Sequence, residues 1–169
     1  MINKKNIKYL TQDAFAGSDM IYRSTKTPFG PAHIGVIEDR LVFFGFGPSA
    51  ERELLQLKDK WKLNHIGCDQ TILSGRDLFQ SPLPMTLIGT PFQQRVWQAL
   101  QDIPAGQTKT YGELADILDS APRAIGGGVG RNPISYFVPC HRVIAQAGGL
   151  GGYRWGLAIK QKILAAETR

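Results

Sequence analysis

Two capping boxes in the second half of the chain constrain its fold more than any other sequence feature. In a capping box, the side chain of a Ser or Thr just before the helix accepts a hydrogen bond from the backbone N–H of the third helical residue. That third residue is a Glu or Gln, whose side chain accepts a hydrogen bond from the backbone N–H of the Ser or Thr. Thr90-Pro91-Phe92-Gln93 has this pattern with proline at the first helical position, and Thr110-Tyr111-Gly112-Glu113 has it again. We therefore predict two helices, the first buried through Phe92, Val96, Ala99 and Leu100, and the second through Leu114 and Leu118.

A third helical segment is predicted after a break at Asp119-Ser120, beginning near Ala121 and running to about Gly130. Two short helices joined by a tight turn are what a helix-turn-helix requires. The third segment contains Gly126, Gly127, Gly128 and Gly130, and each glycine costs a helix about 1 kcal/mol relative to alanine. A flexible loop is the alternative for this stretch.

The first half of the chain has the pattern of a mixed α/β unit. Short strands are predicted at 20–25, 32–37 and 41–46, with turns at 28–31 and 38–40 that favour a hairpin. Ser49 is predicted to cap a helix whose core stripe is Leu54, Leu57 and Trp61, and 69–84 has the composition of a linker between domains. The predicted fold class is α/β, with a small mixed α/β domain over 1–84 and a mostly helical domain with a helix-turn-helix over 85–169.

The tetrapeptide Pro139-Cys140-His141-Arg142 is typical of a prepared nucleophile. A neighbouring base or cation makes a cysteine reactive by favouring its thiolate. The alternative is that Cys140 is an inert buried thiol, since cysteine often packs as a small apolar residue. We expect two free thiols, with Cys140 reactive and Cys68 structural, because a single cysteine pair in a chain without a secretion signal is seldom a disulfide.

Charge and hydropathy favour a partner that is acidic. The net charge is +6, and the basic excess is larger over 86–169 than over 1–85. No run approaches the roughly 20 apolar residues of a membrane span, and Met1-Ile2-Asn3-Lys4-Lys5 is not followed by an apolar signal segment. We therefore expect no membrane association and a cytoplasmic protein.

The order of motifs from Gly89 to Glu167 resembles the active domain of the O6-alkylguanine-DNA alkyltransferases, the methylated-DNA–protein-cysteine methyltransferases. The resemblance covers about half of the chain and is specific because the pieces follow one another in one order; the residues before about position 85 resemble the family only loosely. The pieces are Gly89-Thr90-Pro91-Phe92, Ile103-Pro104-Ala105-Gly106, Thr110-Tyr111-Gly112, Arg131-Asn132-Pro133, Pro139-Cys140-His141-Arg142 and Gly152-Tyr153-Arg154-Trp155-Gly156.

The resemblance implies repair of DNA by irreversible transfer of an alkyl group from O6-alkylguanine to Cys140, once per molecule and without a cofactor. O4-alkylthymine is left open as a second substrate. His141 is expected to act as base through a water, and Glu167 to orient the imidazole. The alternative for Glu167, near the chain end, is a frayed side chain in solvent. Tyr111 is matched to a hydrogen-bond donor to the flipped guanine, with ordinary packing as its alternative, and Asn132 to a residue that ties the recognition helix to the reactive loop.

The same resemblance implies a surface for double-stranded DNA containing O6-alkylguanine, bound by a monomer. Arg123 is matched to the arginine that fills the base stack after the nucleotide is flipped, from a helix in the minor groove. The link between Tyr111 and Arg123 is shorter than usual in the family. Trp155 stands where many members carry glycine, and we expect it to narrow the pocket against large adducts. The expected DNA-binding residues are Arg123, Ala124, Gly126, Gly127, Arg131 and Thr110, and the expected base pocket is Val143, Tyr153, Arg154, Trp155 and Val129.

Two other classes of protein compete with this interpretation. A cysteine hydrolase would also need Cys140 and His141, but adjacent residues are poorly placed for direct proton transfer, and the helix-turn-helix would be unexplained. A protein that only binds alkylated DNA would share Arg123 but would not need the nucleophile. No metal site is predicted, because His65 and Cys68 supply two potential ligands and His33 is distant in the sequence.

Overall fold

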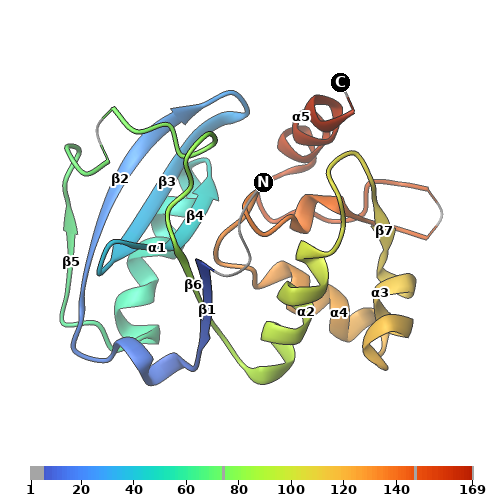
Figure 1. Cartoon of the computed structure of the whole chain (residues 1–169), viewed down its shortest axis with the longest axis horizontal. Helices are drawn as coiled ribbons and strands as arrows, with labels where there is room; N and C mark the ends of the chain where they lie inside the picture. Colours follow the sequence, from blue (N-terminus) through green and yellow to red (C-terminus); the bar gives the residue numbers. More distant parts are fainter. Residues whose placement is uncertain (1–5, 74, 147, 169) are drawn as a thin grey trace. The chain divides into compact units, whose positions relative to one another are not determined.

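The structure is a computed structural model that describes residues 6–73, 75–146 and 148–168 (Figure 1). Met1-Ile2-Asn3-Lys4-Lys5, considered above for a signal segment, lies outside these residues. The chain is a mixed α/β protein that divides into two compact units, Met1–Thr90 and Pro91–Arg169. None of the helices in the described part of the chain combines the length and the hydropathy of a membrane-spanning segment.

The first unit is built on a mixed sheet, with strands in the order β1-β6-β4-β3-β2-β5 among the described residues. The predicted strands are confirmed as β2, β3 and β4, which pair antiparallel. The turn between β3 and β4 has positive φ at Glu38 and Asp39, 48° and 59°, the conformation that favours a two-residue hairpin. The strands are β1 (Ile7–Leu10), β2 (Asp19–Thr27), β3 (Gly30–Ile37), β4 (Arg40–Phe46), β5 (His65–Cys68) and β6 (Met85–Ile88), with a 3-10 helix η2 (Gln12–Phe15) after β1.

Helix α1 (Pro48–Lys60) packs against β3 and β4 (Figure 1). Gly35 permits this close approach, because a Cβ atom there would lie 2.9 Å from Met20 Sδ and 3.5 Å from Leu54 Cδ1. The predicted cap at Ser49 is wrong. Gly47, at φ 74°, is the N-cap, since Pro48 already occupies the first helical position.

The segment predicted as an interdomain linker, 69–84, lies inside the first unit. Its described residues contain no helix or strand, as expected of a connection, but it joins β5 to β6. Strand β6 pairs with β1 along its whole length and with β4 through Leu41 and Met85. The division between units therefore falls after the sheet, at Thr90, rather than at the expected position before Met85.

The second unit is mostly helical. Its elements are α2 (Pro91–Gln101), β7 (Lys109–Thr110), α3 (Tyr111–Leu118), α4 (Pro122–Gly130), the 3-10 helix η3 (Cys140–Arg142), β8 (Val143–Ile144) and α5 (Leu157–Glu167). Helices α2, α3 and α4 pack against one another, and β7 pairs with β8 (Figure 1).

The buried face of α2 differs from the expected one. Val96, Trp97 and Leu100 are buried, whereas Phe92 and Ala99 are half-buried. Trp97 lies on the buried face in place of Phe92 and Ala99. Its burial is possible because its indole Nε1 donates to the Gly128 carbonyl of α4 at 3.0 Å, so the polar end of this large apolar side chain has a partner. Helix α3 likewise buries Leu114 and Ala115, while Leu118 is half-buried.

The capping box at Thr110 is confirmed. Its hydroxyl accepts the Glu113 N–H at 3.1 Å, and the Glu113 carboxylate accepts the Thr110 N–H at 2.7 Å. Helix α3 ends at a left-handed C-cap, Asp119 with φ 49°, and α4 begins at Pro122. The flexible-loop alternative for the glycine-rich segment is wrong, because 122–130 is helical.

Candidate active site

Asn132 organises the loop that leads from α4 to Cys140. Its side chain is buried and donates from Nδ2 to the Val138 carbonyl at 2.8 Å, while its Oδ1 accepts the Ile134 N–H at 3.0 Å. One amide therefore holds two points of the loop, as an Asx side chain can. Within the loop, Tyr136 has a left-handed backbone, φ 71°, and its ring stacks on the imidazole of His141 at 6.0 Å between centroids. A left-handed backbone is unfavourable for a bulky residue, so its presence at Tyr136 indicates that contacts with neighbouring residues fix the conformation of the loop.

His141 and Glu167 form a buried acid–base pair. The imidazole is fully buried, and His141 Nε2 lies 2.9 Å from Glu167 Oε1. The Arg142 guanidinium clamps the same carboxylate, with Nη2 at 2.6 Å from Oε1, and donates from Nη1 to the Ile103 carbonyl at 2.6 Å. The frayed-end alternative for Glu167 is wrong, because its side chain is only 12% exposed.

Electrostatics keep this pair in the form His neutral, Glu ionised. Burial lowers the pKa of His141 and outweighs the opposing effect of Glu167. Burial alone would raise the pKa of Glu167, but hydrogen bonds from His141 and Arg142 and the charge of Arg142, joined by that of His141 where the imidazole is protonated, lower it to about 2. Since Nε2 faces the carboxylate, it carries the imidazole hydrogen, and Nδ1 is left as an acceptor. His141 Nδ1 is buried and has no hydrogen-bond partner among the described residues.

Cys140 lies in a cavity of about 230 Å³ within the second unit. Cys140 is 6% exposed, and its side chain is a free thiol. Seven of the expected site residues line this cavity together: Tyr111, Gly126, Val129, Asn132, Cys140, Tyr153 and Arg154. Gly130, Ser135 and Gly152 complete the lining. The fold therefore brings these predicted side chains together around one cavity, and their roles stay predictions.

Two expected pocket residues do not line the cavity. Val143 is fully buried in β8. Trp155 is also buried, and its indole Nε1 donates to Ser135 Oγ at 2.5 Å. Trp155 is therefore in contact with two residues that line the cavity, Ser135 and Arg154, without lining it itself, and its expected effect on large adducts stays a prediction.

Ser135 and Lys160 are site residues that the sequence did not single out. Cys140 Sγ lies 3.7 Å from Ser135 Oγ. The Lys160 ammonium is buried and donates to the carbonyls of Val143 at 2.5 Å, Gly152 at 3.2 Å and Leu150. Burial lowers the pKa of Lys160 to about 8, although the negative charge of a Cys140 thiolate acts in the opposite direction. A buried lysine is rare, so no sequence pattern would have found it.

Two tyrosines face the cavity with their hydroxyls protonated. The pKa of Tyr111 is raised, mainly by burial and further by the charge of a Cys140 thiolate. The pKa of Tyr153 is raised well above its ordinary value by the same two causes, burial being the larger. The Tyr153 hydroxyl is buried near Cys140 and Ser135, and smaller effects on its pKa come from interaction with the sulfur, which raises it, and with the serine hydroxyl, which lowers it. Both groups therefore remain proton donors at neutral pH.

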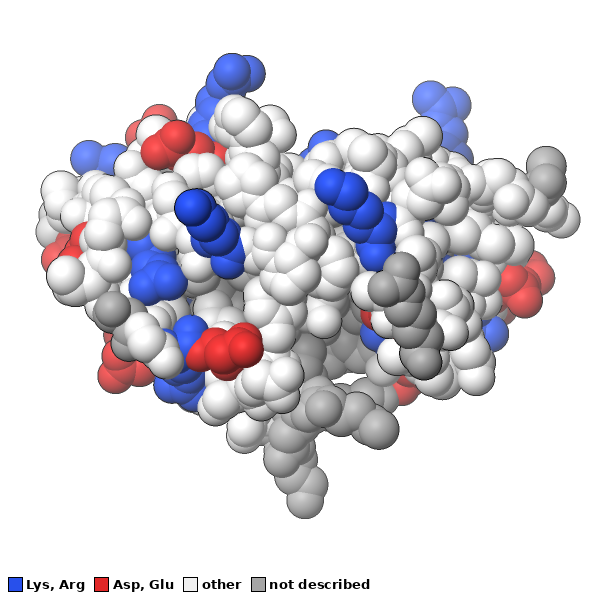
Figure 2. Space-filling view, turned by 90° about the horizontal axis from the view of Figure 1, so that it is seen from above, with Lys and Arg blue, Asp and Glu red and all other residues white. Residues whose placement is uncertain are grey.

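The residues expected to contact DNA lie on or next to α3 and α4. Arg123, Ala124 and Arg131 are exposed, and Gly126 and Gly127 are half-buried. Arg131 Nη1 donates to the Gly127 carbonyl at 3.1 Å, and Thr110 is half-buried at its capping box. On the face shown in Figure 2, Lys and Arg side chains stand apart from one another among uncharged residues. The net charge by itself therefore does not locate a DNA surface on that face.

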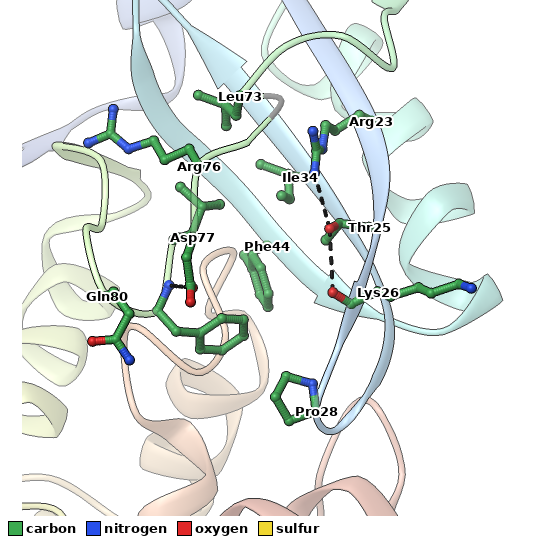
Figure 3. Close-up of a pocket in the computed structure, with 12 residues that line it drawn as sticks. Arg23, Thr25, Lys26, Pro28, Ile34, Phe44, Leu73, Arg76, Asp77 and Gln80 are labelled. Carbon is green, nitrogen blue, oxygen red and sulfur yellow. Dashed lines mark hydrogen bonds between the residues drawn. The ribbon is translucent and has the colours of Figure 1, made fainter.

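A second and larger cavity, of about 330 Å³, lies in the first unit (Figure 3). Ile34 and Phe44 form apolar parts of its wall, and Arg23 donates to the Ile72 carbonyl at 2.8 Å. Figure 3 shows the amino end of Lys26 directed away from the Phe44 ring. The side chains that line it in the described part of the chain include no cysteine or histidine, so it has no cysteine–histidine pair like that of the second unit. Metal chemistry has no candidate either, since no group of three His, Cys, Asp or Glu side chains gathers among the described residues.

A buried cysteine beside a histidine–carboxylate pair, in a unit of short packed helices, is an arrangement that can serve proteins in which a thiol is the nucleophile. Comparison with known proteins narrows this class. The profile described as "6-O-methylguanine DNA methyltransferase, DNA binding domain" matches residues 91–169. A methylated-DNA–protein-cysteine methyltransferase of Methanosarcina acetivorans is 36% identical over 155 residues, which are 88% of this chain and 98% of that protein.

Other relatives match mainly the second half of the chain. The methyltransferase of Lodderomyces elongisporus is 51% identical over 84 residues, which are 48% of this chain and 42% of that protein. The chain thus spans about half the length, or less, of several curated relatives that it matches. Among solved structures, OGT of Mycobacterium tuberculosis in complex with DNA has a TM-score of 0.73 at 33% identity, covering 88% of this chain and 92% of that chain. The chain belongs to the methylated-DNA–protein-cysteine methyltransferase family.

Proposed function

We propose that this protein repairs DNA by transferring an alkyl group from O6-alkylguanine to Cys140, once and irreversibly. The observation that carries the proposal is the arrangement of Cys140 and His141. The thiol lies in a cavity, and the buried His141 Nδ1 is an acceptor without a partner in the described residues, while Glu167 holds Nε2. A water bonded to Nδ1 would pass the thiol proton from Cys140 to the imidazole. The water is needed because residues adjacent in sequence are poorly placed to transfer a proton directly.

The transfer itself is a single displacement at carbon. The Cys140 thiolate attacks the alkyl carbon, an S–C bond forms, and the bond from that carbon to guanine O6 breaks with its electron pair on the base. The departing guanine then takes up a proton, for which the protonated Tyr111 hydroxyl in the cavity is our candidate donor. A thioether has no easy leaving path, so each chain acts once. No cofactor enters this scheme.

The roles of the other cavity residues follow from their positions. We assign Asn132 to holding the reactive loop, because it bonds that loop at two points. Val129, Tyr153 and Arg154 line the same cavity as the thiol and are proposed to surround the flipped base. Val143 is in contact with Lys160 through its carbonyl.

We propose that α3 and α4 act as a helix-turn-helix on double-stranded DNA, with α4 in the minor groove. Supporting observations are the exposed Arg123 in the first turn of α4, the exposed Ala124, and the small side-chain volume at Gly126 and Gly127. Arg123 would occupy the stack where the damaged nucleotide has left it. Arg131 and Thr110 would contact the backbone at the ends of this surface.

In this proposal the second unit carries both DNA binding and the alkyl acceptor, and the first unit is a separate α/β domain. A cytoplasmic location and a monomeric state are part of the proposal, supported by two free thiols that a reducing compartment would preserve. O4-alkylthymine remains open as a second substrate.

The stoichiometry of repair tests this proposal against both rivals. Increasing amounts of a duplex with one O6-methylguanine are incubated with a fixed amount of protein, and restored guanine is counted. We expect restoration to stop at one guanine per chain and to be absent for Cys140→Ser. Many restored guanines per chain would indicate a hydrolase, and lesion binding without restoration would indicate a protein that only recognises damage.

A further inference from the structure

Ser135 has a hydroxyl between the reactive sulfur and the indole of Trp155. The residue is 1% exposed, and its Oγ accepts the Trp155 Nε1–H at 2.5 Å. On the other side Oγ lies 3.7 Å from Cys140 Sγ. All three residues are buried, so water competes little for these contacts.

The chemistry of the three groups decides how the hydroxyl is oriented. An indole nitrogen can only donate, whereas a serine hydroxyl donates once and accepts through two lone pairs. Because Trp155 occupies one lone pair of Ser135, the hydroxyl hydrogen must point elsewhere. When Cys140 is a thiol, its weak S–H donates to Ser135; when Cys140 is a thiolate, the serine O–H is free to donate to the sulfur.

We propose that Ser135 is a catalytic residue that stabilises the Cys140 thiolate by donating its O–H, and that Trp155 is a positioning residue that fixes the hydroxyl. A hydrogen bond to an ionised acceptor is about twice as strong as a neutral one, so the contact favours the thiolate over the thiol. The inference rests on the proposed function, since the thiolate is the nucleophile of that reaction. It gives Trp155 a function that depends on its N–H rather than on its bulk.

Other ionisable groups also surround the sulfur. Tyr111, Tyr153 and Arg154 line the cavity, and Lys160 is close enough for a thiolate to raise its pKa. His141 and Arg142 follow Cys140 in η3, and both bond to Glu167. Lys160, His141 and Arg142 bond to groups other than Ser135 and Trp155, so they keep these partners when either residue is changed. The Tyr153 hydroxyl, in contrast, interacts with both Cys140 and Ser135, and Arg154 lies over the Trp155 ring. A change in the pH dependence of Cys140 that persists when Tyr153 is phenylalanine therefore reports on the serine contact.

The test measures the rate of Cys140 alkylation by iodoacetamide against pH, without DNA, with peptide mass spectrometry to separate Cys140 from Cys68. Ser135→Ala is expected to move the midpoint of this profile upward by about one pH unit, which is about tenfold slower labelling below the midpoint. Trp155→Phe keeps an aromatic ring under Arg154, which lies 5.6 Å from the ring centre, but removes the N–H. It is expected to move the midpoint in the same direction by a smaller amount.

The double variant separates a relay from two independent effects. Once Ser135 is alanine, Trp155→Phe should move the midpoint no further. Trp97→Phe is the matched control, because it also removes an indole N–H bonded within the second unit, at 3.0 Å from the Gly128 carbonyl. We expect it to lower stability and to leave the midpoint unchanged. Unchanged midpoints in Ser135→Ala and in Trp155→Phe would overturn the proposal. It would also be overturned if Trp155→Phe moved the midpoint by the same amount whether Ser135 is present or is replaced by alanine.

Because this assay uses no DNA, its result is independent of repair. A wild-type protein that fails to restore O6-methylguanine, yet shows the expected midpoint shifts, would disprove the proposed function and leave the serine contact intact. Normal repair by the wild-type protein, with midpoints that do not shift in the variants, would support the proposed function and disprove the serine contact. If Ser135→Ala does not fold, Trp155→Phe alone still decides the question.

Discussion

Replacing Glu167 with glutamine tests the electrostatic core of the site. The Glu167 carboxylate is held ionised by His141 and Arg142, and its pKa is about 2 against an ordinary value of 4.5. A lowering of that size corresponds to about 3 kcal/mol of stability. We reduce this to about 2 kcal/mol because solvent reaches part of the carboxylate and screens it.

The sign of the pH dependence follows from the lowered pKa. A carboxyl group with a lowered pKa in the folded state stabilises the protein fully above about pH 4.5, and this contribution disappears as the pH falls toward 2. Glu167→Gln should therefore lower Tm by about 4–8 °C at pH 7, for a chain of this size. The difference between the two proteins should shrink as the pH falls from 4.5 to 2.

Thermal unfolding by circular dichroism between pH 7 and pH 2.5 measures this difference. Asp116→Asn is a suitable control, because it removes an exposed carboxylate from α3 in the same unit and should change Tm little at any pH. A Glu167→Gln protein as stable as wild type at pH 7 would refute the reasoning. A destabilisation of the same size at pH 7 and pH 2.5 would refute it as well, since it would show that the charge is not responsible.

Three further substitutions separate packing from function. Gly128→Ala should destabilise the protein by about 1–3 kcal/mol in urea unfolding, because the new Cβ would lie 2.9 Å from Val96 Cγ2, whereas Gly130→Ala, with open space at its Cβ, should not. Arg123→Ala should weaken binding to a lesion duplex about tenfold or more in a fluorescence titration while changing stability by less than about 0.5 kcal/mol. Asn132→Ala should cost about 1–3 kcal/mol, because it leaves the buried Ile134 N–H unpaired and removes one of the two hydrogen bonds to the Val138 carbonyl, and it should slow methyl transfer measured on the duplex.

Local signals in the sequence were sufficient for the elements that carry their own start and stop residues. The Thr110 capping box sets the start of α3, and Pro122 the start of α4, since both act within one helical turn. The strands of the hairpin were predictable for the same reason. Strands β1, β5 and β6 are only four residues each and pair in parallel with distant segments, so no local pattern distinguishes them from loops.

The site divides in the same way. Cys140, His141 and Arg142 are adjacent in sequence and visible as a motif, and Glu167 was assigned from the family resemblance, four residues after Ile163, which is buried in α5. Ser135 reaches the sulfur through the fold of the loop that Asn132 holds, which has no sequence signature. Trp155 was visible in a motif, but its hydrogen bond to Ser135 was not, because whether a side chain faces a cavity or a neighbouring hydroxyl depends on packing.

The fate of the methyl group tests the central claim most directly. The protein is incubated with a duplex containing one O6-trideuteromethylguanine, digested, and mapped by mass spectrometry. The account predicts one trideuteromethyl group per chain, on the peptide with Cys140, with none on Cys68 and none in Cys140→Ser. A labelled Cys68, label released as methanol, or label that stays on the DNA despite binding would contradict it.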